Sequence, residues 1–375
     1  MSYTTFSQSL TPETLFLNEA QGVSIQRFDN PKYSQILKLL EVQLESVWHP
    51  NEVDMGHDRT NMPNLSEAEE HVVMSNIKRQ ILLDSIMGRA PTLVFGPAIG
   101  DPTLEVCVSW WASMEALHSF SYTHIIQQSF VNPTKTLDEV MDIQEIVDCK
   151  NSIIKYYDDC IDKVEKYYNG EVTRLEAARA IWLALNTANA LESIRFQLSF
   201  ACSFVFGQNG KLPGLANIIK LINRDENYHV AITNNLLAIL PVDDPDFAIV
   251  AKEEETKEKV KEVWRDAIME EYAWGDYLFV KGDIFAFNKK IAMQYLRYIA
   301  TARLQKNNLP SLEELCGLES VYENPIPWIS NWNGERKDQV APQEIEKTDY
   351  EKGIIDKTSD GYAKLANIPL FGTEG

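Results

Sequence analysis

Two copies of Glu-x-x-His lie on long, apolar stretches with helical periodicity, and this pair is the feature that most constrains the fold. The first copy is Glu115 with His118, and the second is Glu226 with His229. Residues three apart lie one above the other on a helix, so each copy places a carboxylate and an imidazole on one helix face. Two such helices can enclose a pair of metal ions when two further helices each add a carboxylate.

Two isolated acids are candidates for those further carboxylates. Asp84 lies in the apolar run QILLDSIMG, and Glu192 lies in TANALESIRFQLSF. A buried acid is costly unless it is paired or binds a metal. Asp84 precedes the first Glu-x-x-His by 31 residues and Glu192 precedes the second by 34, about one helix and a turn in each case. The alternative, two solvated salt-bridge faces and two exposed acids, is disfavoured by the apolar neighbours.

The chemistry of this donor set indicates which metals it would take. Four carboxylates and two imidazoles suit iron or manganese better than copper or zinc. The four carboxylates carry a charge of about −4, which two divalent cations would balance, and such paired ions lie roughly 3.5–4 Å apart. The sequence therefore predicts a two-metal carboxylate site, with iron or manganese left open.

Apolar periodicity over most of the chain predicts an all-α bundle of six to eight long helices. Only residues 92–98 could alternate with the period of a strand. Helices of this length exceed the usual average of about 11–12 residues, and long antiparallel helices are typical of bundles. The predicted helical stretches are 33–48, 66–87, 101–130, 138–168, 172–206, 212–240, 248–280 and 284–305.

The composition changes after about residue 325, where the chain becomes polar with scattered prolines. We expect residues 1–325 to form the helical domain and residues 326–375 to form a C-terminal tail, flexible from about residue 335. An apolar cluster at the end of such a tail is typical of a docking peptide, although a frayed terminus is the alternative. The cluster consists of Leu365, Ile368, Leu370 and Phe371.

Charge argues against several classes of function. Lys and Arg number 35 against 55 Asp and Glu, which gives 35 − 55 = −20, and the isoelectric point is near 4.8. Nucleic acid and anionic lipid are bound by clustered basic residues, so neither partner is expected. The acidity indicates either simple solubility or attraction of cations or of a basic partner.

Cysteine usage and hydropathy predict a cytoplasmic protein. The five cysteines form an odd set with no Cys-x-x-Cys spacing, as expected for reduced thiols. The N-terminus lacks a basic segment followed by an apolar one, so no secretory signal is expected. No stretch of about 18 apolar residues occurs, because polar residues interrupt the most apolar segment, 179–206.

Tyr122 lies on the same predicted helix face as the first metal-binding pair. It follows His118 by four residues and Glu115 by seven, so its phenol should point towards the metal ions. Apolar side chains around the phenol would protect an oxidised tyrosine from quenching. The candidates for this wall, which on their own fit an ordinary core better, are Phe196, Phe200 and Ile222.

Six segments give the chain a specific resemblance. It resembles the small, radical-bearing beta subunit of class I ribonucleotide reductase, of the aerobic class Ia type. The similarity extends from Trp48 to Tyr350, nearly the whole chain, and HSFSYTHII is its most discriminating part. The segments are VWHPNEVDMGHDR, LLDSIMGRAP, MEALHSFSYTHII, NALESIRFQLSFACSF, LINRDENYHV and VAPQEIEKTDY.

The resemblance implies a role for each matching residue. Tyr122 would carry a stable radical, which Trp48 would relay outward, and Tyr350 in the tail would pass it to the large subunit. Trp48 would be coupled to His118 through Asp225, consistent with the usual carboxylate partner of a metal-bound histidine. Apart from the resemblance, a core Trp48 and a surface Asp225 are favoured. Asp84, Glu115 and His118 would hold the metal nearer the tyrosine, and Glu192, Glu226 and His229 the other, with Glu115 and Glu226 shared.

The resemblance also implies a fold and an activity. The expected protein is a ferritin-like homodimer whose two iron ions per chain, or manganese, react with O2 to oxidise Tyr122. The tail would dock on the large catalytic subunit, which converts ribonucleotides to deoxyribonucleotides. This chain has no GxxxxGK[ST] phosphate loop, so it would not bind the nucleotide alone. It also has no cysteine pair placed for substrate reduction, so a partner must supply the thiols.

Two alternatives remain open at this stage, one a different enzyme and the other from another class of function. A di-iron monooxygenase or desaturase would oxidise its substrate at the metals, but it would not require the apolar surround of Tyr122 or the tail. A ferritin-like iron-storage or purely structural bundle would usually be about half as long. Such a bundle would also have no use for an isolated tail tyrosine.

Overall fold

The computed structural model describes residues 14–18, 25–130, 134, 138–139, 142–285 and 287–333. Internal contacts divide the chain into two units, residues 1–335 and 336–375, and the second unit lies outside the described residues. Tyr350 and the apolar end of the tail therefore lie outside the description. Ile326 and Ile329 are buried, so the packed part of the chain continues past residue 325.

Helices make up most of the described chain, which confirms the predicted all-α fold. The only described β-type pairings are two isolated bridges, Phe16 with Ile99 and Ile284 with Phe287. The longer helices are α1 (Ser34–Glu45), α3 (Glu67–Met87), α4 (Pro102–Ser129), α6 (Gln144–Tyr168), α7 (Arg174–Ala190), α8 (Gln197–Gln208), α9 (Pro213–Asp243), α11 (Glu254–Leu278) and α12 (Lys289–Lys306). The short ones are α2 (Gly56–Asn61), α10 (Pro245–Val250), α13 (Leu312–Cys316) and α14 (Ser330–Asn333).

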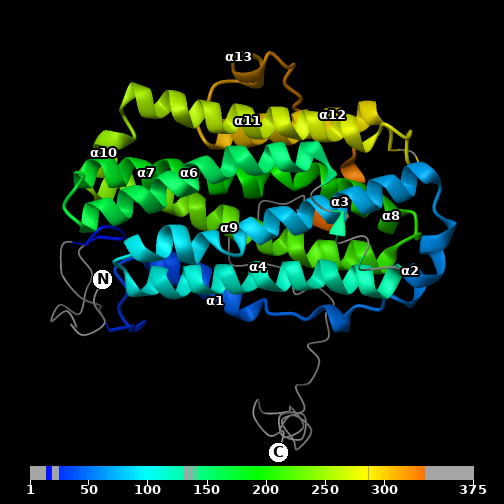
Figure 1. Cartoon of the computed structure of the whole chain (residues 1–375), viewed down its shortest axis with the longest axis horizontal. Helices are drawn as coiled ribbons and strands as arrows, with labels where there is room; N and C mark the ends of the chain where they lie inside the picture. Colours follow the sequence, from blue (N-terminus) through cyan, green and yellow to red (C-terminus); the bar gives the residue numbers. More distant parts are fainter. Residues whose placement is uncertain are drawn as a thin grey trace, which may run out of the picture. The chain divides into compact units, whose positions relative to one another are not determined.

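The long helices run roughly side by side along the bundle (Figure 1). Helix α4 packs on α1 and α3, α9 packs on α7 and α8, and α11 packs on α6, α7 and α12. This arrangement brings α3, α4 and α9 together with the chain that joins α7 to α8. None of the described helices is both long enough and apolar enough to cross a lipid bilayer.

The helices predicted to begin at residues 138, 248 and 284 begin later, as α6 at Gln144, α11 at Glu254 and α12 at Lys289, and two further predicted elements differ in kind. Residues 92–98 form no strand; they belong to a π-helical turn, Pro91–Phe95, and a 3-10 turn, Gly96–Ala98. Pro91 is the first residue of the π-helical turn and Pro97 the second residue of the 3-10 turn, positions where the fixed φ of proline suits a helical start. The predicted helix 172–206 is interrupted by a π-helical turn, Leu191–Arg195, so it becomes α7 and α8.

Local and distant caps fix where the site-bearing helices begin. The Asp101 side chain accepts a hydrogen bond from the Leu104 N–H at 2.8 Å and caps α4. Helix α9 is capped across the sequence instead, because Asp58 Oδ1 accepts from the N–H of Gly214 at 2.9 Å and Oδ2 from that of Leu215 at 2.6 Å. Both helices that carry a Glu-x-x-His therefore have defined starts.

Candidate metal centre

The structure brings all six predicted metal-site residues into one buried cluster. Donor atoms of Asp84, Glu115, His118 and Glu226 lie within 4.8 Å of one another, and so do those of Glu115, Glu192, Glu226 and His229. The two sets overlap at Glu115 and Glu226. They derive from α3, α4, α9 and the π-helical turn, and each residue is at most 1 % exposed.

The two shared carboxylates lie between the two imidazoles. His118 Nδ1 is 3.1 Å from Glu226 Oε1 and 3.5 Å from Glu115 Oε2. His229 Nδ1 is 2.9 Å from Glu226 Oε2 and 3.0 Å from Glu115 Oε1. Each carboxylate thus offers one oxygen to each half of the cluster, which is the arrangement needed to bridge two cations.

The electrostatics of the cluster favour bound cations. Burial, followed by the charges of Glu115 and Glu226, raises the pKa of Asp84 and that of Glu192 well above their usual ranges. Burial opposes ionisation of Glu226, but His118 and His229 outweigh it and lower the pKa of Glu226. Without cations, burial and the repulsion between the carboxylates keep some of them protonated. Two divalent cations would neutralise that repulsion and allow the carboxylates to release their protons.

Unpartnered buried atoms show that the donor set fits metal ions. Both carboxylate oxygens of Asp84 and of Glu192, together with Oε1 of Glu226, have no hydrogen-bond partner within the described parts of the chain. Buried polar atoms are normally satisfied, so such a group requires an explanation. Oxygen and imidazole donors facing a common centre match hard and borderline cations, which supports a two-metal site.

Trp111 is a member of the site that the sequence analysis did not identify. Its Nε1–H donates to Glu115 Oε1 at 2.9 Å, and its ring stacks on His229 with centroids 5.2 Å apart. Because Trp111 precedes Glu115 by four residues on α4, helix spacing could have placed it on the same face. It orients one shared carboxylate and supports one imidazole.

A buried hydrogen-bonded line leads from the cluster towards Trp48. Asp225 Oδ2 accepts from Trp48 Nε1 at 2.7 Å and lies 3.2 Å from His118 Nε2. Asp225 is fully buried, so the surface interpretation of this acid is wrong. Arg224 donates to Asp225 Oδ1 from Nε at 3.0 Å and from Nη2 at 2.9 Å, which holds the carboxylate in place.

Tyr122 is fully buried on α4 beside the cluster. Burial, followed by the charges of Asp84 and Glu226, raises its pKa well above the usual value, so the phenol keeps its proton near neutral pH. Phe196, Phe200 and Ile222 are buried as well, and the two phenylalanine rings stack with centroids 5.3 Å apart. The predicted apolar residues are therefore all in the core.

Known proteins are similar in sequence to this chain over nearly its full length. Residues 26–312 match the family described as ribonucleotide reductase, small chain. The chain belongs to the ribonucleotide reductase small-chain family. It is 39 % identical to ribonucleoside-diphosphate reductase subunit beta of Haemophilus influenzae, over 96 % of this chain and 98 % of that protein. It is also 39 % identical to ribonucleoside-diphosphate reductase 1 subunit beta of Salmonella typhimurium, with the same coverage.

A solved structure shares the fold of the ribonucleotide reductase small chain described here. The R2 subunit of Clostridium botulinum ribonucleotide reductase aligns with a TM-score of 0.71 at 21 % identity, over 88 % of this chain and 97 % of that one. As a ribonucleotide reductase small subunit, the chain is part of an oxidoreductase and has the large subunit as its partner. These relatives do not favour the monooxygenase, desaturase or storage alternatives.

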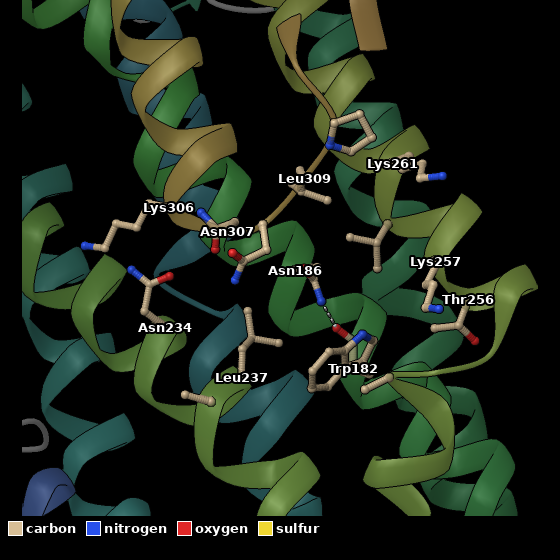
Figure 2. A pocket seen from close by; sticks show the side chains of 15 residues that line it. Trp182, Asn186, Asn234, Leu237, Thr256, Lys257, Lys261, Lys306, Asn307 and Leu309 are labelled. Atoms are coloured by element: carbon tan, nitrogen blue, oxygen red, sulfur yellow. Dashed lines mark hydrogen bonds between the residues drawn. The ribbon is translucent and has the colours of Figure 1, made fainter. Parts of the chain in front are cut away.

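A separate cavity of about 430 Å³ contains none of the cluster residues (Figure 2). It lies among α7, α9, α11 and the chain that follows α12, with Trp182, Asn186 and Asn234 in its lining. Its described lining includes lysines such as Lys257 and Lys306 but no carboxylate. The cavity therefore lacks the donors of the metal centre.

Proposed function

We propose that the buried cluster holds two iron ions and that Tyr122 is the side chain oxidised to a stable radical. The proposal is supported by two overlapping donor sets that share two carboxylates. Manganese has the same ligand preference and is the alternative metal. Asp84, Glu115 and His118 would hold the ion nearer Tyr122, and Glu192, Glu226 and His229 the other, with Glu115 and Glu226 shared between the two sets.

The protein residues would prepare this site for oxidation by O2. When bound, the metal pair supplies the oxidising power that removes one electron and one proton from the Tyr122 phenol. Asp225 accepts a hydrogen bond from the Nε2–H of His118. The lone pair of Nδ1 is then free to bind a metal ion in the cluster. The buried surroundings of Tyr122 exclude water, so a tyrosyl radical formed there would persist.

The radical would then leave the bundle along His118, Asp225 and Trp48, in that order. The two buried hydrogen bonds of this line support the route, and Tyr350 would continue it to the large subunit. The large subunit would use the radical to reduce ribonucleotides to deoxyribonucleotides, the precursors of DNA. Residues 326–375 would act as the docking tail of a cytoplasmic homodimer, with no contact to nucleic acid or membrane.

Metal content tests the ligand assignment directly. We expect Glu226→Ala and His118→Ala to prevent stable loading of two irons per chain, because each removes a ligand and leaves the remaining carboxylates repelling one another. His124→Ala is the matched control, since His124 lies on the same helix as His118 but outside the cluster. Iron analysis of the purified proteins would overturn the assignment if both ligand variants retained two irons.

A reconstitution experiment separates iron from manganese. Metal-free protein would be loaded with Fe(II) or with Mn(II) and then exposed to O2. We expect the tyrosyl radical with iron. A radical that forms only after manganese loading would contradict the assignment of iron while leaving the two-metal site intact.

A further inference from the structure

The π-helical turn that carries Glu192 is the least regular element of the site. A π-helical turn has i→i+5 backbone hydrogen bonds in place of the i→i+4 bonds of an α-helix. Such turns are rare, and contacts from outside the helix help to stabilise them. Glu192 is the second residue of the turn and Arg195 is the last. A relaxation of this turn to α-helix would rotate Glu192 relative to Glu226 and His229.

Arg79 of α3 supports the end of this turn from another helix. Its Nη1 donates to the backbone carbonyl of Arg195 at 3.1 Å and also to the Glu271 carboxylate. The guanidinium lies over the Trp274 ring, 4.7 Å from its centroid. Arg79 is 1 % exposed and Glu271 is fully buried, so this pair lies in the core and not on the surface.

The Arg195 side chain is held by α6 and α11, and it shares the contact to Cys149 Sγ with Arg79. Arg195 Nη1 donates to Glu270 and lies 3.2 Å from Cys149 Sγ, and Arg195 Nη2 donates to Ser152 Oγ at 3.1 Å. The backbone of Arg195 and its side chain are thus tied to three helices. None of these contacts involves a residue of the metal cluster.

We propose that Arg79, held in place by Glu271, is a positioning residue that keeps the π-helical turn in register and so holds Glu192 at the second metal position. The inference rests on the proposed two-metal function. A buried ion pair by itself contributes little to stability compared with an apolar pair of the same size. The bond to the Arg195 carbonyl gives this pair a role in the geometry of the site.

The test compares the wild-type protein with a double variant, Arg79→Met with Glu271→Met. Replacing both charges avoids leaving one of them buried alone, so the protein should remain folded. Metal-free protein would be titrated with Mn(II) while EPR follows the metal. The wild-type protein should bind two ions with an exchange-coupled signal. In the double variant we expect the second ion to bind at least about tenfold more weakly, with an isolated six-line Mn(II) signal at one equivalent.

The matched control is Arg174→Met with Asp244→Asn, which also removes both charges of a largely buried ion pair and keeps the side-chain acceptor for the Asp246 N–H. Arg174 also joins acids to backbone carbonyls, because it bonds Asp244, Asp246 and the carbonyl oxygen of Leu17. This control should keep two coupled ions. Thermal unfolding of the metal-free proteins would be recorded alongside, so that a general loss of stability is seen separately from a loss of the second ion.

The outcomes distinguish this inference from the proposed function. If the double variant binds two coupled ions as tightly as the wild-type protein, Arg79 does not position Glu192. If the wild-type protein itself binds no pair of ions, the two-metal function fails first. The inference would also be contradicted if the double variant and the Arg174 control both bound the two Mn(II) ions more weakly, and to the same extent. The effect would then reflect a general loss of structure.

Discussion

At the scale of single residues, Asp225 lies between the His118 imidazole and Trp48. A substitution there should therefore affect turnover without preventing oxidation of Tyr122. Asp225→Asn keeps the size of the side chain but removes the charge and one acceptor oxygen. We expect Tyr122 still to be oxidised after iron loading, while turnover with the large subunit falls at least about tenfold, because the hydrogen-bonded line to His118 is broken. Asp243→Asn is the control, since Asp243 lies on the same helix and pairs with Lys32 and Tyr33 at the other end. Normal turnover by Asp225→Asn would exclude Asp225 from the relay.

The sequence identified the six clustered residues because their signal is local. Each is a polar residue on an apolar helical stripe. Helix spacing places Tyr122 on the same face as His118 and Glu115. Arg79 and Asp58 could not be found this way, because their partners lie far away in the sequence. Asp58 caps a helix more than 150 residues later, and Arg79 bonds a carbonyl on another helix. Only the folded chain brings these groups together.

At the scale of elements, close packing of α8 against α9 depends on Gly207. A Cβ atom at this position would clash with the Cβ of Ala216 and with the Trp332 ring. We expect Gly207→Ala to lower the free energy of unfolding by about 1–3 kcal/mol, the usual effect of overpacking, although alanine is the better helix former. Gly96→Ala is the control, since no neighbouring group lies within 4 Å of its Cβ position and its backbone is helical, and it should leave the free energy of unfolding unchanged or raise it by up to about 1 kcal/mol. Chemical denaturation would measure the free energy of unfolding of both variants. An unchanged value for Gly207→Ala would contradict the prediction and show that α8 and α9 can shift to accommodate the added methyl group.

The helix pattern predicted most of the elements but missed the turns that shape the site. Apolar periodicity found α3, α4 and α9 with ends within a few residues. It could not show that residues 191–195 form a π-helical turn, because one inserted residue barely changes the pattern of an apolar segment that is buried on all sides. The irregular turn occurs where Glu192 must face the other donors.

At the scale of the whole molecule, the proposed tail should separate binding from turnover. Deletion of residues 361–375 should leave metal loading and the Tyr122 radical intact but weaken association with the large subunit strongly, because the apolar cluster at residues 365–371 would be lost. Tyr350→Phe should still bind the large subunit, yet turnover should stop because the relay is broken. A synthetic peptide of residues 361–375 should compete with the full chain for the large subunit. Binding and activity assays at low subunit concentration would measure these effects, and normal activity of the truncated chain would contradict a docking role.

The most direct test of the central claim is an EPR spectrum recorded after metal-free protein has been loaded with Fe(II) and exposed to O2. We predict a long-lived organic radical whose hyperfine splitting narrows when the protein contains β-deuterated tyrosine. In Tyr122→Phe, which keeps the shape of the side chain and removes only the hydroxyl, we predict two bound irons and no such radical. The absence of any radical from the wild-type protein, or the same radical in Tyr122→Phe, would contradict the account.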